Sequence, residues 1–66
     1  MTSNAPLTRT DARRYAGWLV KNREARPETI EIVEEWSTGA HFIRYANLCG
    51  MPRSIKSHAD FIEVRG

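Results

Sequence analysis

The stretch STGAHFIRYANLCGMPRS, residues 37–54, decides between two folds for this chain. In the first interpretation, residues 37–39 form a turn, residues 41–48 form a β-strand, and the Gly-Met-Pro segment forms the next turn. In the second, the stretch is the first helix and the bend of a helix-turn-helix, with Ala46 and Gly50 four residues apart. The first interpretation describes a small binding module built on a sheet, and the second describes a DNA reader.

Hydrophobic periodicity alone does not separate the two interpretations. The apolar residues of 27–36 and 40–49 fit one face of a helix as well as one face of a strand. Both segments are rich in β-branched and aromatic residues and are bounded by Gly or Pro turns, which favours strands. Pro52 also occupies the bend of the helix-turn-helix, and the apolar anchor Ile55 follows it too early. We therefore expect an α+β fold, with an all-α helix-turn-helix as the alternative.

Outward from this stretch, the chain predicts a short helix followed by a small antiparallel sheet of three to four strands. Thr8 or Thr10 is suited to cap the helix, Asp11 favours its positive end, and Gly17 is a natural stop. Residues 1–7 read as a disordered start, followed by a single domain at 8–66. The expected elements are a helix at about 9–16 and strands at about 17–22, 29–36, 41–48 and 61–65, arranged as an SH3-like or open barrel.

Length and composition exclude several classes of protein. Sixty-six residues make one domain with a small core, because only about 60% of the unfolded surface is buried at this size. Cys49 is the only cysteine, so an intramolecular disulfide is excluded, and one Cys with two His cannot complete a Cys/His zinc site. No apolar run approaches the roughly 18 residues of a membrane span, and the start lacks a signal-peptide core. We expect a soluble, cytoplasmic protein with no cofactor, no metal and no membrane partner.

Charge is distributed unevenly along the chain. Residues 1–27 carry six Arg or Lys against two acids, whereas residues 28–37 carry four Glu and no base. The remainder has four bases against two acids, which gives the net charge of +2. A large phosphate-binding surface therefore requires that folding separates the basic segment from the acidic one. Otherwise both segments simply keep the protein in solution.

Four motifs in order, GWLVKN, PETIEIVEEW, HFIRYANLCGMPRSI and ADFIEV, resemble the very short proteins that are scattered through phage and prophage genomes. The resemblance covers roughly residues 17–64 and leaves residues 1–16 outside. It implies a small antiparallel sheet or SH3-like barrel encoded by a mobile element of a bacterial host. Most proteins of this kind have no assigned activity, so the resemblance carries over no functional residues.

Few residues are suited to catalysis. Histidine is the side chain that most often serves as an acid or base near neutral pH, and the chain has His41 and His58. Asp60 lies two residues from His58, a spacing that two exposed polar residues also show. Cys49 is expected to be a small buried apolar residue beside a turn, because nothing in its sequence neighbourhood activates a thiolate. No catalytic residue is predicted, and the chain is not expected to be an enzyme.

Aromatic and basic residues supply the candidate binding surfaces. Trp18 and Trp36 are expected in the core, with an exposed aromatic hot spot for a protein partner as the alternative. The predicted partner-binding residues are Arg13, Arg14, Tyr15, Trp18, Arg44 and Tyr45. A second possibility is a stacking platform for single-stranded nucleic acid made by Phe42, Arg44 and Tyr45. If the chain binds nucleic acid as a helix-turn-helix, the predicted contacts are Arg53, Ser54, Lys56 and Ser57.

The acidic residues Glu31, Glu34 and Glu35 are expected to form a solvated strand edge, because charge on an edge deters aggregation. Taken together, the sequence favours a non-enzymatic interaction protein of a phage or mobile element. We expect it to bind a host protein complex of the defence or transcription machinery and to inhibit or modulate it, as an anti-CRISPR protein does. The alternative is a small nucleic-acid-binding transcriptional regulator.

Overall fold

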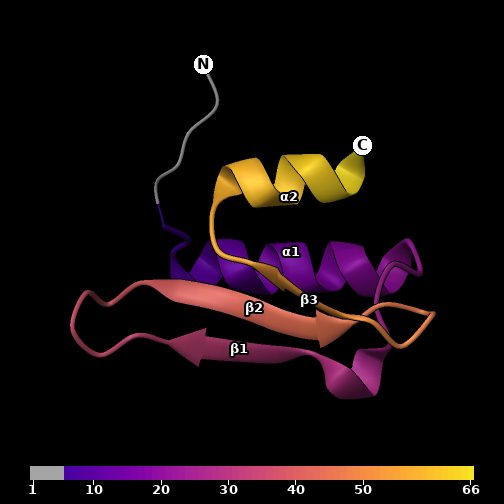
Figure 1. The fold of residues 1–66 in the computed structure, drawn as a ribbon. Coiled ribbons are helices and arrows are strands. Elements are labelled where there is room, and N and C mark those ends of the chain that lie inside the picture. The colour runs from indigo at the N-terminus through magenta and orange to yellow at the C-terminus, as the bar shows by residue number, and fades with distance from the viewer. Residues whose placement is uncertain (1–5) are drawn as a thin grey trace.

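Two helices and three strands make up the fold in the computed structural model, which describes residues 6–66. In chain order they are α1 (Arg9–Lys21), the 3-10 turn η1 (Pro27–Thr29), β1 (Glu31–Glu34), β2 (His41–Ala46), β3 (Pro52–Ile55) and α2 (His58–Arg65). The strands form one antiparallel sheet in the order β1-β2-β3. Helix α1 lies along one face of this sheet, and α2 lies beyond β3, alongside α1 (Figure 1). The predicted α+β class is confirmed, and the all-α helix-turn-helix alternative is wrong.

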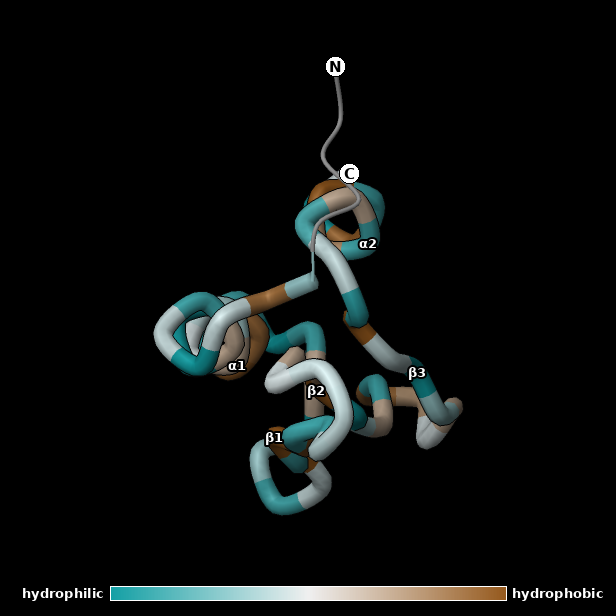
Figure 2. The backbone as a smooth tube through the Cα atoms, turned by 90° about the vertical axis from the view of Figure 1, so that its left-hand side faces the viewer, coloured by the Kyte–Doolittle hydropathy of each residue, from teal (hydrophilic) through white to brown (hydrophobic). Residues whose placement is uncertain are grey.

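The sheet is open, with β1 and β3 as its two edges. Figure 2, turned by 90°, shows α1 on one side of the strands and no helix on the other side. The two faces of the sheet therefore differ: one is covered by α1, and we call the other the open face. Neighbouring residues of a strand point to opposite faces, so the register of β2 decides which of its side chains lie on the open face.

Helix α1 begins as the sequence predicts and ends later. The Thr8 hydroxyl accepts a hydrogen bond from the Asp11 N–H at 3.1 Å, which caps the first turn. The helix then continues past Gly17 to Lys21, so the predicted end at about 16 and the predicted strand at 17–22 are wrong. Gly17 lies on the exposed side, where a helical glycine costs only about 1 kcal/mol. Burial of Leu19 on the opposite side, one turn beyond Tyr15 and two turns beyond Ala12, stabilises the longer helix.

The side chains of the central strand β2 alternate between the two faces of the sheet. Ile43 is fully buried on the face toward α1, between its cross-strand partners Ile32 and Ile55. Tyr45 lies on the same face and is also buried. The strand ends at Ala46, two residues before the predicted end, because the chain then enters a tight loop in which the Asn47 N–H bonds the Met51 carbonyl.

The start of the domain is anchored to this strand. The Leu7 carbonyl accepts a hydrogen bond from the His41 N–H at 3.1 Å, and the Leu7 side chain is buried in the core. The ordered domain therefore includes Pro6 and Leu7, which were predicted to be disordered. The rest of that prediction, at 1–5, lies outside the described residues.

Strand β1 is shorter than the predicted strand at 29–36. Thr29 lies in η1, where its hydroxyl donates to the Arg26 carbonyl at 2.7 Å and accepts from the Ala46 N–H at 2.9 Å. At the other end, the chain leaves the sheet after Glu34 and turns back through a loop that contains Trp36. Trp36 is 97% exposed, so its predicted place in the core is wrong.

The C-terminal third differs most from expectation. Residues 52–55 form β3, a strand that the sequence did not predict, because Pro52 is typical of a turn. Proline is, however, tolerated as the first residue of an edge strand. The predicted strand at 61–65 is instead helix α2, capped by the Ser57 hydroxyl, which accepts from the Asp60 N–H at 3.3 Å. Phe61 and Val64, three residues apart, are the positions of α2 that pack against the core, and helical spacing alone places both on one side.

The core is small, as the chain length requires. Its buried side chains come from α1, β2, β3 and α2 and from two residues outside these elements, whereas η1 and β1 contribute none. They are Leu7, Ala12, Leu19, Ala25, Ile43, Tyr45, Ile55 and Phe61. Tyr15, Ala16, Trp18, Ile30 and Val64 pack against this cluster from its edge. Trp18 therefore does contribute to the core, as predicted.

Candidate functional site

The feature that most resembles a binding site is Trp36 at the tip of the β1–β2 hairpin. The loop around it is closely hydrogen-bonded: the Glu35 N–H donates to the Ala40 carbonyl, and the Gly39 N–H donates to the Glu35 carbonyl, both at 2.8 Å. Gly39 has a φ of 70°, a left-handed conformation that glycine adopts without strain. The backbone of the tip is therefore held in place while its indole ring projects into solvent.

Two acidic side chains lie just before the tip of this hairpin. Glu34 and Glu35 precede Trp36 directly, and the Glu35 carboxylate accepts a 3.4 Å hydrogen bond from the Ser37 hydroxyl. Glu34 lies 3.7 Å from the His41 Nε2 atom across the strand pair. The other ring nitrogen of His41, Nδ1, is buried and has no hydrogen-bond partner among the described residues. We call Trp36 with Glu34 and Glu35 the hairpin-tip site.

The predicted partner-binding cluster on α1 is not formed. Arg13 and Arg14 are both exposed, with Arg13 beside a hollow that it lines together with Glu34, whereas Tyr15 and Trp18 are turned inward. The Tyr15 ring stacks on Phe61 with a centroid distance of 3.7 Å, and Trp18 meets the same ring edge-on at 5.3 Å. These two aromatics hold α2 to α1 and are not available as an exposed hot spot.

What α1 does present to solvent is positive charge. Its exposed positions include the bases Arg9, Arg13, Arg14 and Lys21, and its single acid, Asp11, is half-buried on the side toward α2. No Arg or Lys in residues 6–66 lies within 4.0 Å of a carboxylate. We call these four bases the basic face of α1. Two of these bases, Arg9 and Arg13, nevertheless line a hollow together with Glu34 and His41, so this end of the basic face lies beside the acidic hairpin.

The predicted platform of Phe42, Arg44 and Tyr45 is divided between the two faces of the sheet. Tyr45 is buried toward α1, and this burial raises the pKa of its hydroxyl above the usual value for tyrosine, an effect that nearby Arg53 partly offsets. Phe42 and Arg44 lie on the open face. Lys56 joins them there, with its Nζ atom 5.9 Å from the centre of the Phe42 ring. This is a weak cation–π contact at most.

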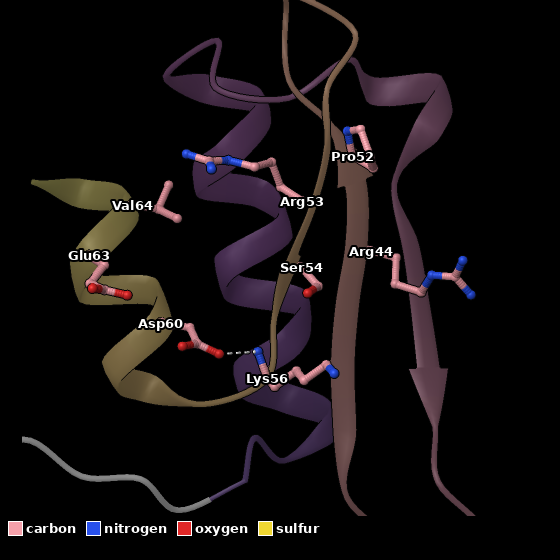
Figure 3. Close-up of a pocket in the computed structure, with 8 residues that line it drawn as sticks. All are labelled: Arg44, Pro52, Arg53, Ser54, Lys56, Asp60, Glu63 and Val64. Atoms are coloured by element: carbon pink, nitrogen blue, oxygen red, sulfur yellow. Dashed lines mark hydrogen bonds between the residues drawn. The ribbon is translucent and has the colours of Figure 1, made fainter.

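A hollow of about 750 Å³ lies between β3 and α2 and contains three of the four residues predicted to contact nucleic acid. Figure 3 shows that its two arginines diverge: Arg53 extends toward α2 and Arg44 extends the opposite way. Asp60 also faces the hollow, where it accepts a hydrogen bond from the Lys56 N–H at 2.9 Å. The hollow therefore carries both signs of charge and does not converge on a single anion.

The four residues predicted for nucleic acid do not form a recognition helix. Arg53 and Ser54 belong to β3 and point to opposite faces, Lys56 follows the strand, and Ser57 caps α2. The predicted helix-turn-helix contacts to nucleic acid depend on a helix that begins at residue 53, and the structure has no helix there. The observed helix starts only at His58 and carries two acids, the partly buried Asp60 and the exposed Glu63.

His58 takes part in a short chain of polar contacts between the helices. Its Nδ1 atom lies 2.6 Å from the Tyr15 hydroxyl, and its Nε2 atom lies 3.6 Å from the Asp11 carboxylate. Asp60, which the sequence placed beside His58, instead bonds the Lys56 backbone. The contacts of His58 join α1 to α2.

The opposite end of the sheet also exposes apolar side chains. Leu48 and Met51, in the β2–β3 loop, are 53% and 59% exposed, and Cys49 between them is exposed as well. The predicted burial of Cys49 is therefore wrong. The Asn47 side-chain oxygen accepts from the Cys49 and Met51 N–H groups, and this arrangement turns the intervening side chains outward.

The part of the chain that the structure describes contains neither a cluster of metal-ligating side chains nor a membrane-spanning helix. Between residues 6 and 66, no three His, Cys, Asp or Glu side chains gather as metal ligands would. No helix in that range is long and apolar enough to cross a membrane.

A comparison of the chain with protein-family models, with curated proteins and with solved structures found no match. The assignment of a function therefore rests on the surfaces themselves. From the sequence, Trp36 was expected in the core and its exposure was only the alternative, although two signals pointed to exposure. Two glutamates precede it and the turn residues Ser-Thr-Gly follow it, so a strand extended to Trp36 has polar chain on both sides.

Proposed function

We propose that this protein is a non-enzymatic binding protein that attaches to a protein partner through its hairpin-tip site. In the setting that the sequence resemblance implies, the partner is a host protein complex in the bacterial cytoplasm, and attachment inhibits or modulates it. The phage or mobile-element origin rests on the resemblance of residues 17–64 alone.

The observation that carries this proposal is the exposure of Trp36 on an ordered hairpin. Tryptophan is strongly enriched among the residues that dominate the energy of protein interfaces. Burying its ring removes about 150–250 Å² from water, which is a large part of one side of a small interface. A rigid tip also loses little conformational entropy on binding. The neighbouring Glu34 and Glu35 favour a partner pocket with an apolar floor and a basic rim.

Replacing Trp36 by Ala tests this proposal. We expect affinity for the captured partner to fall by about 30-fold or more, which corresponds to about 2 kcal/mol for a central aromatic contact. The stability of the fold should change by less than about 0.5 kcal/mol, because the ring packs against nothing. The measurement is capture from bacterial lysate by the immobilised full chain at physiological salt, followed by titration of the purified partner.

Leu48→Ala is the matched control, since it removes an exposed apolar side chain at the opposite end of the sheet. It should leave the affinity unchanged. Equal binding by wild type and Trp36→Ala would refute the hairpin-tip site as the docking surface. Failure to capture any protein from several hosts would refute the function itself.

A second candidate function, nucleic-acid binding, is favoured by one observation: no base of the basic face of α1 lies within 4.0 Å of a carboxylate among residues 6–66. Binding there would be electrostatic and would weaken steeply with salt, because each neutralised phosphate releases counterions. The double variant Arg13→Gln, Arg14→Gln should then weaken binding to mixed DNA and RNA and reduce the salt slope by about two. The pair Arg44→Gln, Lys56→Gln, on the open face, is the control. Absence of binding at low salt would eliminate this candidate.

A further inference from the structure

The free edge of β1 runs beside the hairpin-tip site. β1 is an edge strand of the sheet, and Figure 1 shows no other strand beyond it, although the η1 turn curls below its N-terminal end. The opposite edge, at β3, is partly closed: Pro52 has no N–H to offer, and the Lys56 N–H is already bonded to Asp60. The two edges are therefore not equivalent, and β1 is the one that can accept another strand.

The register identifies the backbone groups on this edge. The Glu35 N–H donates to the Ala40 carbonyl, so this residue pair belongs to the hydrogen-bonded type. Hydrogen-bonded and non-hydrogen-bonded pairs alternate along an antiparallel ladder. Val33 and Glu31 consequently turn their backbone groups toward β2, whereas Ile32 and Glu34 turn theirs outward. The edge thus offers the N–H and C=O groups of Ile32 and Glu34 to a neighbouring strand.

The side chains of β1 set the chemistry that such a strand requires. On the open face, alternation places Glu31 and Val33 in a row, and the hydrogen bond from the Glu35 N–H to the Ala40 carbonyl continues this row one residue beyond β1, which gives acid, apolar, acid. Glu31 has Arg44 as its cross-strand neighbour on β2, but neither the Glu31 nor the Glu35 carboxylate lies within 4.0 Å of a Lys or Arg among residues 6–66. Residues directly opposite each other in a sheet interact, and pairs of opposite charge are favourable. The complementary row is therefore base, apolar, base, at every second residue.

We propose that β1 binds an extended segment of the partner protein by strand addition, and that this segment has the pattern basic-x-apolar-x-basic. This inference rests on the proposed function, because it describes the part of the partner that lies next to the Trp36 pocket. Main-chain hydrogen bonds in strand addition supply affinity, and alternate side chains supply specificity. The pattern reads the same in both directions, so it suits a parallel or an antiparallel partner strand.

A second copy of the chain does not fit this edge. Pairing β1 with itself would bring glutamates of one chain against glutamates of the other, and like charges directly opposite destabilise a sheet. The acids thus discourage self-association through β1 and select for a basic partner strand.

The test uses a synthetic peptide with the core Lys-Thr-Val-Thr-Lys and a control in which Glu replaces both Lys residues. We expect the Lys peptide to bind at low millimolar affinity or better and the Glu peptide not to bind. Hydrogen exchange resolved by NMR should show that saturating Lys peptide slows exchange of the Ile32 and Glu34 amides by about tenfold, while the Leu48 amide is unaffected. No binding of the Lys peptide, or binding that leaves both amides unchanged, would overturn the inference.

Two substitutions separate the backbone from the side chain at Ile32. Ile32→Pro removes the outward N–H without removing a ladder hydrogen bond, and Ile32→Thr keeps that N–H. The Pro variant should bind the peptide about tenfold more weakly than the Thr variant. Where the Pro variant does not fold, the pair Glu31→Lys, Glu35→Lys replaces it, and this variant should bind the Glu peptide in preference to the Lys peptide. Equal binding by the Pro and Thr variants, or no exchange of preference, contradicts the inference.

These outcomes are distinguishable from failure of the proposed function. If Trp36→Ala abolishes capture of the partner while no peptide binds, the strand-addition inference fails and the hairpin-tip site stands. If the Lys peptide binds as expected and no partner protein is captured, the edge is correctly described and the proposed function fails.

Discussion

Replacing Phe61 by Ala is expected to unfold a large fraction of the protein. Phe61 is the buried residue of α2, and its ring contacts both Tyr15 and Trp18 of α1. Truncating a buried phenylalanine costs about 3–5 kcal/mol. A chain of this length has a total stability of about 3–10 kcal/mol, so the loss is comparable with the whole. The measurement is urea denaturation followed by tryptophan fluorescence, in which the change reports Trp18 because Trp36 is exposed already.

Two controls identify the cause of the expected loss. Phe61→Leu keeps most of the apolar volume but removes the aromatic stacking, and it should cost about 1–2 kcal/mol. Ile62→Ala alters the neighbouring residue, which is 53% exposed, and should change stability by less than about 0.5 kcal/mol. A loss of similar size in Phe61→Ala and Ile62→Ala would contradict the packing of α2 described above.

The accuracy of the sequence-based predictions follows the range of the interactions involved. The start of α1 depends on Thr8 and Asp11, three residues apart, and it is correct. The strand predicted at 41–48 rests on local composition and flanking turns, and β2 is found there, with its end two residues early. Local rules fail where distant contacts decide the structure: Gly17 does not end the helix, because burial of Leu19 against the sheet outweighs its low propensity.

The same reasoning explains why the C-terminal segment was assigned to the wrong class. Phe61, Ile62 and Val64 have β-branched or aromatic side chains, which suit a strand when the sequence is considered alone. An alternating strand would, however, place Glu63 on the same side as Phe61, toward the core. A helix places Val64 there instead and leaves Glu63 exposed. The helix is stabilised by its packing against α1, which lies more than forty residues earlier in the sequence. The contacting residues Tyr15 and His58, for example, are 43 residues apart.

The candidate site was the least predictable part of the molecule. The sequence correctly indicated an acidic strand with Glu31 and Glu34, and it correctly placed Arg13 and Arg14 in a basic segment. The sequence does not show that the hairpin begins to turn one residue before Trp36. A difference of one residue in the length of the loop decides whether the ring of Trp36 faces the core or the solvent. Exposure of that ring, rather than a motif, is what distinguishes the hairpin-tip site from an ordinary turn.

A matched pair on β2 should show the largest contrast between neighbouring residues. Ile43→Ala is expected to cost about 2–5 kcal/mol, because the side chain is fully buried between Ile32, Ile55 and α1. Phe42→Ala removes a larger side chain from the open face, where the ring is only half-buried, and should cost less than about 2 kcal/mol. The free energies of unfolding of both variants are measured under the same conditions. Because a slip of one residue exchanges the two faces of a strand, a larger loss for Phe42→Ala would mean that the register of the sheet is wrong. The expected order, in contrast, keeps Glu31, Val33 and Glu35 together on the open face, which is the arrangement on which strand addition at β1 depends.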